Sequence, residues 1–231
     1  MAQSLPPRLD AVLRLVTPCS LLADVATDHG LLAVAAVTQG VAQRALACDL
    51  RAAPLQVAKQ AIERRELSDV ISTARGDGLL PLEGSGADAL VIAGLNGELV
   101  VRILERGEAQ LRGVTQVVIQ PNRGAELVRA WGRARGWHLR DETMAAQRER
   151  TYVVMAFVPG TGPDPAYVHP RLGVDALGLL GPHLLRHKDA VARSDYARQA
   201  ARLARVVRKG GVQEAPALAL WETGLREIDL R

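Results

Sequence analysis

The sequence is poor in several residue types, and each shortage excludes a class of protein. Only two cysteines occur among the 231 residues, Cys19 and Cys48, and neither belongs to a CxxC motif or a Cys/His cluster. Buried free thiols in a reducing cytosol are therefore expected rather than a disulfide framework. No apolar run approaches the ~18 residues of a membrane span. The first residues also lack the charged-then-apolar pattern of a signal peptide, so we predict a cytoplasmic protein without a membrane partner.

Aromatic and lysine side chains are scarce as well. Aromatics make up 3% of the chain against 48% hydrophobic residues, which predicts a sizeable core built from Ala, Val, Leu and Ile. The formal net charge is +4, and lysine occurs only at Lys59, Lys188 and Lys209, so arginine supplies most of the positive charge. Arginine both pairs with phosphate and stacks on bases, which fits a polyanion partner. Coding bias in a GC-rich genome explains the same composition, and charge alone does not separate the two.

Segments of strand and helix character alternate along most of the chain. Strands are predicted at residues 20–25, 44–49, 70–74, 87–94 and 115–121, and helices at about 6–16, 31–38, 52–65, 98–106 and 125–135. Two further strands, at 138–145 and 151–158, follow without a helix between them, which predicts an antiparallel hairpin at the sheet edge. This order indicates an α/β fold, a doubly wound and mostly parallel seven-stranded sheet over residues 1 to about 160.

A Pro- and Gly-rich stretch at 159–170 predicts a boundary between this domain and a helical region at 161–231. A helix of about 20 residues is predicted at 189–208, followed by a shorter one near 217–228. One face of the long helix has a coiled-coil-like apolar seam, formed by Tyr196, Ala200, Leu203 and Val207. Another face has three arginines, Arg198, Arg202 and Arg205.

Polar residues follow the first four predicted strands, where an open α/β sheet binds its ligand. The stretch LLADVATDHG places Asp24, Asp28 and His29 after the first strand, and Asp49 ends the second. Asp77 stands in RGDGL after the third strand, and Asn96 stands in AGLNG after the fourth. Each of these has a structural alternative: Asp24 as a cap, His29 as a first-turn histidine, Asp77 as a β-turn residue and Asn96 as a left-handed position.

The chemistry of these turns favours one cofactor. A carboxylate at the Asp49 position typically accepts hydrogen bonds from ribose hydroxyls, which fits both NAD and S-adenosylmethionine. NAD requires a G-x-G-x-x-G turn next to its pyrophosphate, whereas the turn here reads DVATDHG and would repel it with two carboxylates. S-adenosylmethionine has a sulfonium and an ammonium group and suits an acidic turn. The sequence has no Walker lysine and no evident metal-ligand spacing, so we expect no metal.

The segments LLADVATDHG, ARGDGL, LVIAGLNGELVVRILERG and VVIQPN, in this order, resemble the bacterial tRNA (adenine-22-N1)-methyltransferase family. The resemblance covers about residues 8–158 and continues in LLGPHLL at 179–185 and the helix after it. It implies a Rossmann-like S-adenosylmethionine-dependent methyltransferase with a coiled-coil-like C-terminal domain. The implied substrate is N1 of an adenine in the D-loop region of tRNA, at position 22.

The resemblance also implies the site residues. Those expected to bind the cofactor are Asp24, Ala26, His29, Asp49, Leu50, Gly76, Asp77, Gly78, Ala93 and Gly94. Asp28 is expected to stabilise the charge that develops on the methylated adenine, and Asn96 and Asn122 are expected to hold the base. The arginines of the C-terminal helix are expected to contact phosphates.

The sequence departs from the family pattern at three positions. Ala26 replaces the glycine of D-I-G-T-D-H, Asn96 replaces a glycine of A-G-M-G-G, and Asp49 replaces a glutamate. Two alternatives therefore stay open: a methyltransferase with another substrate, and a non-catalytic relative that binds the cofactor or RNA. The oligomeric state stays open too.

Overall fold

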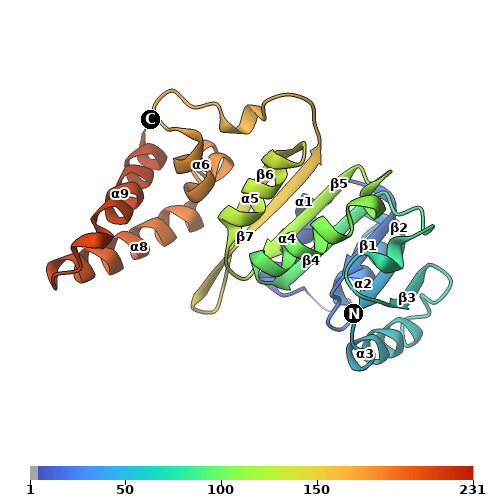
Figure 1. The fold of residues 1–231 in the computed structure, drawn as a ribbon. Helices are drawn as coiled ribbons and strands as arrows, with labels where there is room; N and C mark the ends of the chain where they lie inside the picture. Colours follow the sequence, from blue (N-terminus) through green and yellow to red (C-terminus); the bar gives the residue numbers. More distant parts are fainter. Residues whose placement is uncertain (1–4, 231) are drawn as a thin grey trace.

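The computed structural model describes residues 5–230 and contains one seven-stranded sheet with helices on both faces (Figure 1). The strand order across the sheet is β3-β2-β1-β4-β5-β7-β6. The pairs among β1 to β5 are parallel, and β7 runs antiparallel to both β5 and β6. The strands are β1 (Cys19–Val25), β2 (Ala42–Asp49), β3 (Ile71–Arg75), β4 (Ala89–Leu95), β5 (Gln116–Pro121), β6 (Trp137–Gln147) and β7 (Arg150–Pro159). This is the Rossmann-like arrangement that the sequence predicts.

Two apolar clusters cover the two faces of the sheet. One is formed by side chains of α1 (Pro7–Leu15), α2 (Leu31–Thr38) and the end of α3 (Ala52–Glu63), packed on the first side. The other is formed by α4 (Gly97–Arg106) and α5 (Ala125–Ala134) on the second side. Every residue of β5 is buried, as expected for a central strand that is covered on both faces. Short 3₁₀ helices lie at Leu80–Leu82, Glu108–Leu111, Pro165–Tyr167 and Val212–Glu214.

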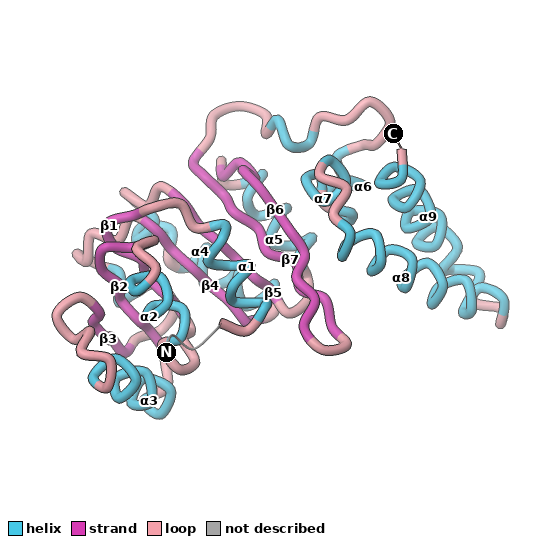
Figure 2. The backbone as a smooth tube through the Cα atoms, turned by 180° about the vertical axis from the view of Figure 1, so that it is seen from behind, coloured by secondary structure: helices cyan, strands magenta, loops and turns pink. Residues whose placement is uncertain are grey.

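The C-terminal part forms four helices beside the β6 edge of the sheet (Figure 2). They are α6 (Val174–Leu180), α7 (Pro182–Arg186), α8 (Ala190–Arg208) and α9 (Ala215–Asp229). The long pair α8 and α9 was predicted, and Tyr196, Ala200 and Leu203 of the predicted seam are buried. Helices α6 and α7 were not predicted from the sequence, because each is short and Gly181 and Pro182 interrupt the periodic pattern between them.

The apolar cluster on the α4 and α5 side continues into these helices through Leu177, Leu180, Leu184, Tyr196 and Ile228. The predicted division of the chain near residue 160 stays a prediction, because the packing runs across it. In the described part of the chain, no helix is long and apolar enough to cross a membrane.

A buried ion pair fastens the C-terminal helices to the sheet. Arg129 of α5 donates from Nε to Glu142 Oε2 of β6 at 2.9 Å, its Nη2 lies 2.8 Å from the same oxygen in an ion pair, and the two side chains are 2% and 0% exposed. Arg129 also donates to the carbonyl of Gly178, while the main-chain N–H of His183 donates to Glu142 Oε1. At Gly181, a Cβ atom would lie within 3.0 Å of both side chains of the pair. Glycine is thus the residue that allows the chain to pass over the ion pair.

Candidate active site

The turn between β1 and α2 lies at the carboxyl edge of the parallel strands. Its first residue, Ala26, has φ = 61°, a left-handed conformation that side chains other than glycine seldom adopt. The next residue, Thr27, donates its main-chain N–H to the carbonyl of Cys48 at 2.9 Å, which ties the turn to β2. Gly30, with φ = 68°, then begins α2. The positive φ at this position therefore explains why the family pattern has glycine there.

Asp24 lies under this turn and is 5% exposed. Its Oδ2 accepts a hydrogen bond from the Thr27 hydroxyl at 2.7 Å. Burial, with a smaller contribution from the nearby Asp49, raises the pKa of Asp24 to about 6 against the lowering effect of hydrogen bonds from Thr27 and the Ala33 main chain. The capping alternative for Asp24 is therefore seen in the structure, and its carboxyl group is held in place within the turn.

Asp49 ends β2 and is also 5% exposed. Its Oδ1 accepts from the Arg51 main-chain N–H at 2.7 Å and from the Arg51 Nε at 3.3 Å. Within residues 5–230, Oδ2 of Asp49 accepts no hydrogen bond. The carboxylate thus has a fixed orientation and one oxygen left for a ligand, in a residue that lines a cavity.

This cavity has a volume of about 320 Å³ and opens between the ends of β1, β2, β3 and β4. Six of the predicted cofactor residues line it, and Leu95, Leu99 and Ile103 form an apolar part of its wall that the sequence analysis did not name. The signal for Leu99 and Ile103 was their spacing of four on the predicted helix after the AGLNG turn, which places them on one face. The predicted residues that line the cavity are Ala26, Asp49, Leu50, Gly76, Asp77 and Gly78.

Asp77 follows β3 and lines the same cavity. Its Oδ2 accepts from Arg106 of α4 at 2.6 Å, so the Asp77 carboxylate is already paired on one side. The adjacent Gly76 donates its N–H to the carbonyl of Asp49, which holds the two acidic turns side by side. A Cβ atom at Gly76 would lie 2.6 Å from Pro81. Packing against Pro81 therefore requires glycine at position 76.

The end of β4 contains a bulge at Gly94, where the pairing with β5 shifts register. Gly94 has φ = 86°, and Ala93 before it is partly buried against the α1 and α2 side. The next polar residue, Asn96, is the N-cap of α4, with its side chain accepting from the Leu99 N–H at 2.8 Å. Its φ of −80° and ψ of 154° are extended, so the left-handed alternative for Asn96 was wrong.

Asp28 and His29 stand at the outer side of the first turn. Their side chains are 80% and 53% exposed, and His29 Nδ1 lies 3.1 Å from Asp28 Oδ2. Neither residue lines the cavity, whereas both belong to the turn that borders it. Asp28 thus offers a solvent-accessible carboxylate beside the cavity, and His29 pairs with it.

Asn122 connects the strand ends to a second, larger space. Its Nδ2 donates to the carbonyl of Gly94, and its main-chain N–H donates to the carbonyl of Leu95 at 2.7 Å. It also lines a groove of about 500 Å³ between the β5–α5 turn, the tip of the β6–β7 hairpin and helices α8 and α9. Seven cationic or aromatic residues line this groove: Arg123, Arg129, Arg150, Tyr152, Tyr196, Arg198 and Trp221.

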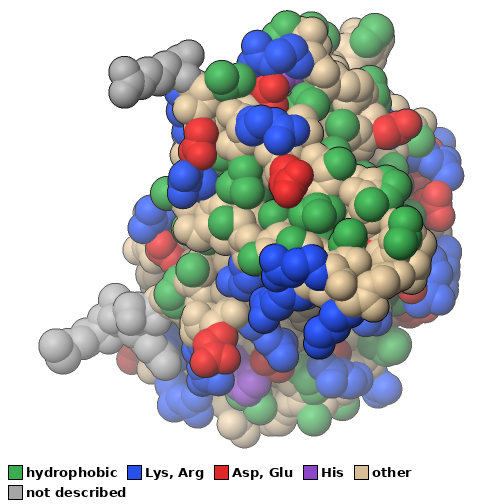
Figure 3. All heavy atoms as spheres, turned by 90° about the vertical axis from the view of Figure 1, so that its left-hand side faces the viewer, with side chains coloured by type: hydrophobic (Ala, Val, Ile, Leu, Met, Phe, Trp, Pro, Cys, Tyr) green, Lys and Arg blue, Asp and Glu red, His purple; other side chains and the backbone are tan. Residues whose placement is uncertain are grey.

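Figure 3 views the molecule from the side of the C-terminal helices. Lys and Arg side chains gather on this face next to hydrophobic side chains. Helix α8 exposes Arg202 and Arg205, which contact only Gln199 and the carbonyl of Ala201 among the described residues, with no carboxylate partner. Arg198 pairs instead with Asp195. The face therefore has positive charge available for an anionic partner.

Comparisons with known proteins agree with this arrangement. A methyltransferase-domain family model matches residues 5–155. The chain is 33% identical over 187 residues to the tRNA (adenine(22)-N(1))-methyltransferase of Bacillus subtilis, covering 81% of this chain and 77% of that protein. It is 30% identical over 166 residues to a putative tRNA methyltransferase of Mycoplasma pneumoniae, covering 72% and 73%.

Solved structures show the same fold over nearly the whole chain. The crystal structure of the B. subtilis m1A22 tRNA methyltransferase has a TM-score of 0.86 at 27% identity, covering 96% of this chain and 99% of the other. A Streptococcus pneumoniae protein described as a putative tRNA (m1A22) methyltransferase, in complex with S-adenosyl-L-methionine, has a TM-score of 0.85 at 23% identity, covering 96% and 100%. With the acidic cavity at the strand ends and this extent of sequence identity, the chain belongs to the tRNA (adenine(22)-N(1))-methyltransferase family.

Proposed function

We propose that this protein is a cytoplasmic S-adenosylmethionine-dependent methyltransferase that modifies N1 of the adenine at position 22 of tRNA. The observation that carries the proposal is the cavity at the strand ends, with the unpaired Asp49 oxygen directed by Arg51, in a chain 33% identical to an enzyme of that name. Family likeness supplies the substrate, and the cavity supplies the place for the cofactor.

The residues present fit S-adenosylmethionine. When bound, this cofactor supplies a methyl group activated by a positively charged sulfur. Asp49 has a free oxygen for ribose hydroxyls, and Leu50, Leu99 and Ile103 provide an apolar wall for an adenine ring. The buried carboxylates of Asp24 and Asp49 would repel a pyrophosphate, whereas they would attract a cationic ligand.

The remaining predicted residues surround this cavity in the proposal. Asp24 and His29 belong to the first turn, and Ala93 and Gly94 form the end of β4, where the bulge brings the backbone towards the ligand. Asn96 keeps α4 in place by its cap and retains its NH₂ group as a donor. These roles are assigned from position and are part of the proposal.

Asp28 and Asn122 are proposed to act on the target base. Adenine N1 has a lone pair in its neutral form, so its methylation needs alignment rather than a strong base. The ring then becomes cationic, and the exposed Asp28 carboxylate is placed to stabilise that charge. Asn122 lies between the Gly94 carbonyl and the groove, a position suited to hold the base that leaves its stack.

The test of this function is transfer of labelled methyl from S-adenosylmethionine to unmodified tRNA, with the modified nucleotide mapped. Label on N1 of adenine 22 is expected. A transcript with that adenine changed to guanine serves as the control and should remain unlabelled. Cofactor binding without label on any tRNA would contradict the proposal and favour a non-catalytic relative, and label on another nucleotide would change the substrate.

Two variants separate cofactor binding from catalysis. We expect Asp49→Ala to abolish cofactor binding in a calorimetric titration, because no other acid ends β2 to accept the ribose hydroxyls. We expect Asp28→Ala to retain most binding and to lose turnover, since Asp28 lies outside the cavity wall. Unchanged affinity in Asp49→Ala, or wild-type turnover in Asp28→Ala, would remove the corresponding assignment.

A further inference from the structure

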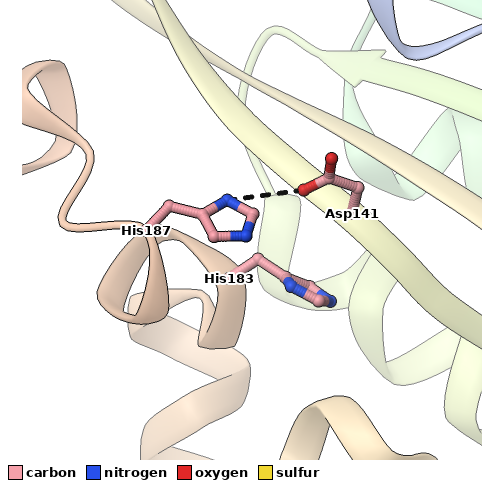
Figure 4. A group of neighbouring side chains, drawn as sticks. All are labelled: Asp141, His183 and His187. Atoms are coloured by element: carbon pink, nitrogen blue, oxygen red, sulfur yellow. Dashed lines mark ion pairs between the residues drawn. The ribbon is translucent and has the colours of Figure 1, made fainter.

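A cluster of three side chains lies at the junction of the sheet and the C-terminal helices, away from the cavity. Asp141 comes from β6, His183 lies in α7, and His187 is the C-cap residue of α7 (Figure 4). One potential ligand atom from each of the three lies within 4.8 Å of the others. His187 Nδ1 is 3.5 Å from Asp141 Oδ1, and the two imidazole rings have their centroids 5.5 Å apart.

The spacing of the histidines has a physical consequence. Residues i and i+4 of a helix share one face, so His183 and His187 can bind one ion together, as paired histidines do in helical zinc sites. The expectation of no metal from the sequence did not take this spacing into account. The third side chain, Asp141, is distant in sequence and lies in β6 at the point where the pairing with β7 shifts register, between Leu139 and Asp141.

His183 is held in the orientation that a metal ligand requires. It is 7% exposed, and its Nε2 lies 2.9 Å from the carbonyl of Leu139. That carbonyl can only accept, so Nε2 carries the hydrogen and Nδ1 has the lone pair. A metal-ligating histidine typically donates its other ring N–H to a carbonyl or carboxylate in this way. The main chain of His183 is fixed as well, by its bond to the buried Glu142.

We propose that Asp141, His183 and His187 bind a divalent transition-metal ion of the zinc type. Two imidazoles and one carboxylate are a donor set that suits zinc, whereas magnesium and calcium prefer oxygen ligands alone. Asp141 and His187 are 38% and 49% exposed, so the site is open to solvent and leaves room for water as a fourth ligand. The ion joins β6 to α7, beside the Arg129–Glu142 pair, and strengthens the attachment of the C-terminal helices.

One neighbouring side chain opposes the ion. Arg186 Nη1 lies 3.3 Å from His183 Nδ1, so the guanidinium donates to the same lone pair that the metal uses. Arg186 is exposed and can turn towards solvent. Its removal should therefore tighten metal binding, which is the opposite of the effect expected for a ligand. Removal of a ligand should thus raise the zinc Kd, whereas removal of Arg186 should lower it.

The experiment is calorimetric titration of Zn²⁺ into the full chain after treatment with a chelator, with Mg²⁺ as the comparison ion. The expected result is one Zn²⁺ per chain and no Mg²⁺ binding. His187→Ala and Asp141→Asn should each raise the zinc Kd by at least about tenfold. Loss of a residue that only hydrogen-bonds to a metal ligand already weakens metal binding by about that factor. Arg186→Ala should lower the Kd, and His138→Ala, a histidine of β6 outside the cluster, should leave it unchanged.

Thermal unfolding provides a second readout that does not depend on methyl transfer. Zn²⁺ should raise the Tm of the wild type and of His138→Ala, and it should raise the Tm less in His187→Ala, because only a ligand that binds the folded state stabilises it. Absence of zinc binding in the wild type overturns the proposal. Binding that survives in His187→Ala and Asp141→Asn but disappears in His29→Ala also overturns it, because the ion then sits at the Asp28–His29 pair.

Discussion

Ala26 places a methyl group in a left-handed turn at the cofactor cavity, with φ = 61°. For an L-residue this conformation costs roughly 1–2 kcal/mol relative to the right-handed one. The turn is held in this conformation by Thr27, whose hydroxyl donates to Asp24 and whose main-chain N–H donates to the carbonyl of Cys48. The fold therefore tolerates alanine in place of the family's glycine, and the backbone of this turn is strained as a result.

Two substitutions at Ala26 test this description. Ala26→Gly should keep the free energy of unfolding within about 1 kcal/mol of the wild type, because relief of strain offsets the greater freedom of the unfolded chain. Ala26→Val should lower it by at least about 1 kcal/mol and weaken cofactor binding, since β-branched residues are outliers at positive φ. Urea unfolding and calorimetry measure both. An equal free energy of unfolding for the glycine and valine variants would show that the backbone at position 26 is not strained.

Asp24 makes stability depend on pH. Its pKa is raised from 3.8 to about 6, so the folded state binds a proton more readily than the unfolded state. The stabilising contribution is full below about pH 4 and is lost as the pH rises towards 6. Wild type should therefore lose on the order of 2–3 kcal/mol relative to Asp24→Asn between pH 4 and 7. Urea unfolding of both proteins across this range checks it, and parallel pH curves would exclude Asp24 as the cause.

Among the elements, α5, β6 and the α6–α7 turn are joined by Arg129 and Glu142. A charge buried to this degree is stable only with its partner, and loss of one partner typically costs about 3–5 kcal/mol. The pair also explains why two short helices form in a stretch with weak helical periodicity, because Glu142 accepts the first N–H groups of α7 and Arg129 donates to the end of α6.

Glu142→Ala is accordingly expected to lower the free energy of unfolding by about 3–5 kcal/mol. The matched control is Glu105→Ala, which breaks the half-exposed pair with Arg135 on the surface and should cost no more than about 1 kcal/mol. Chemical unfolding of the two variants under the same conditions compares them. A similar small loss for both would show that the buried pair does not fasten the helices.

At the scale of the whole molecule, charge is divided between two places. Carboxylates gather around the cavity at the strand ends, while unpaired arginines lie on α8 beside the groove that Asn122 lines. A cationic cofactor and an anionic nucleic acid would therefore approach different parts of one edge. Phosphate contacts of this kind position the RNA and depend on salt.

Replacement of Arg202 and Arg205 by alanine should weaken tRNA binding and reduce the slope of log K against log salt concentration by about 2, one unit for each lost phosphate contact. The matched control replaces Arg44 and Arg64, which are exposed at the amino end of β2 and after α3, and its slope should equal that of the wild type. Filter binding over a range of salt concentrations measures all three. An unchanged slope in the α8 variant would show that the RNA does not bind through Arg202 and Arg205.

The order of strands and helices, the antiparallel hairpin and the α8–α9 pair could be predicted from the sequence alone. The reason is that hydrophobic periodicity is local, and each strand or helix shows its own period whatever it packs against. The acidic turns at Asp24, Asp49 and Asp77 could be placed on one edge by the rule for parallel sheets. The negative charge of these turns indicated a cationic cofactor.

Only the tertiary structure decided what lies between distant segments. It placed Leu99 and Ile103 in the cavity wall and joined Asn122 to a groove formed with α8 and α9. It showed that Asn96 caps α4, and it brought Asp141 to His183 and His187. These relations depend on how helices pack on the sheet, which is a property of the packed chain and has no local pattern in the sequence.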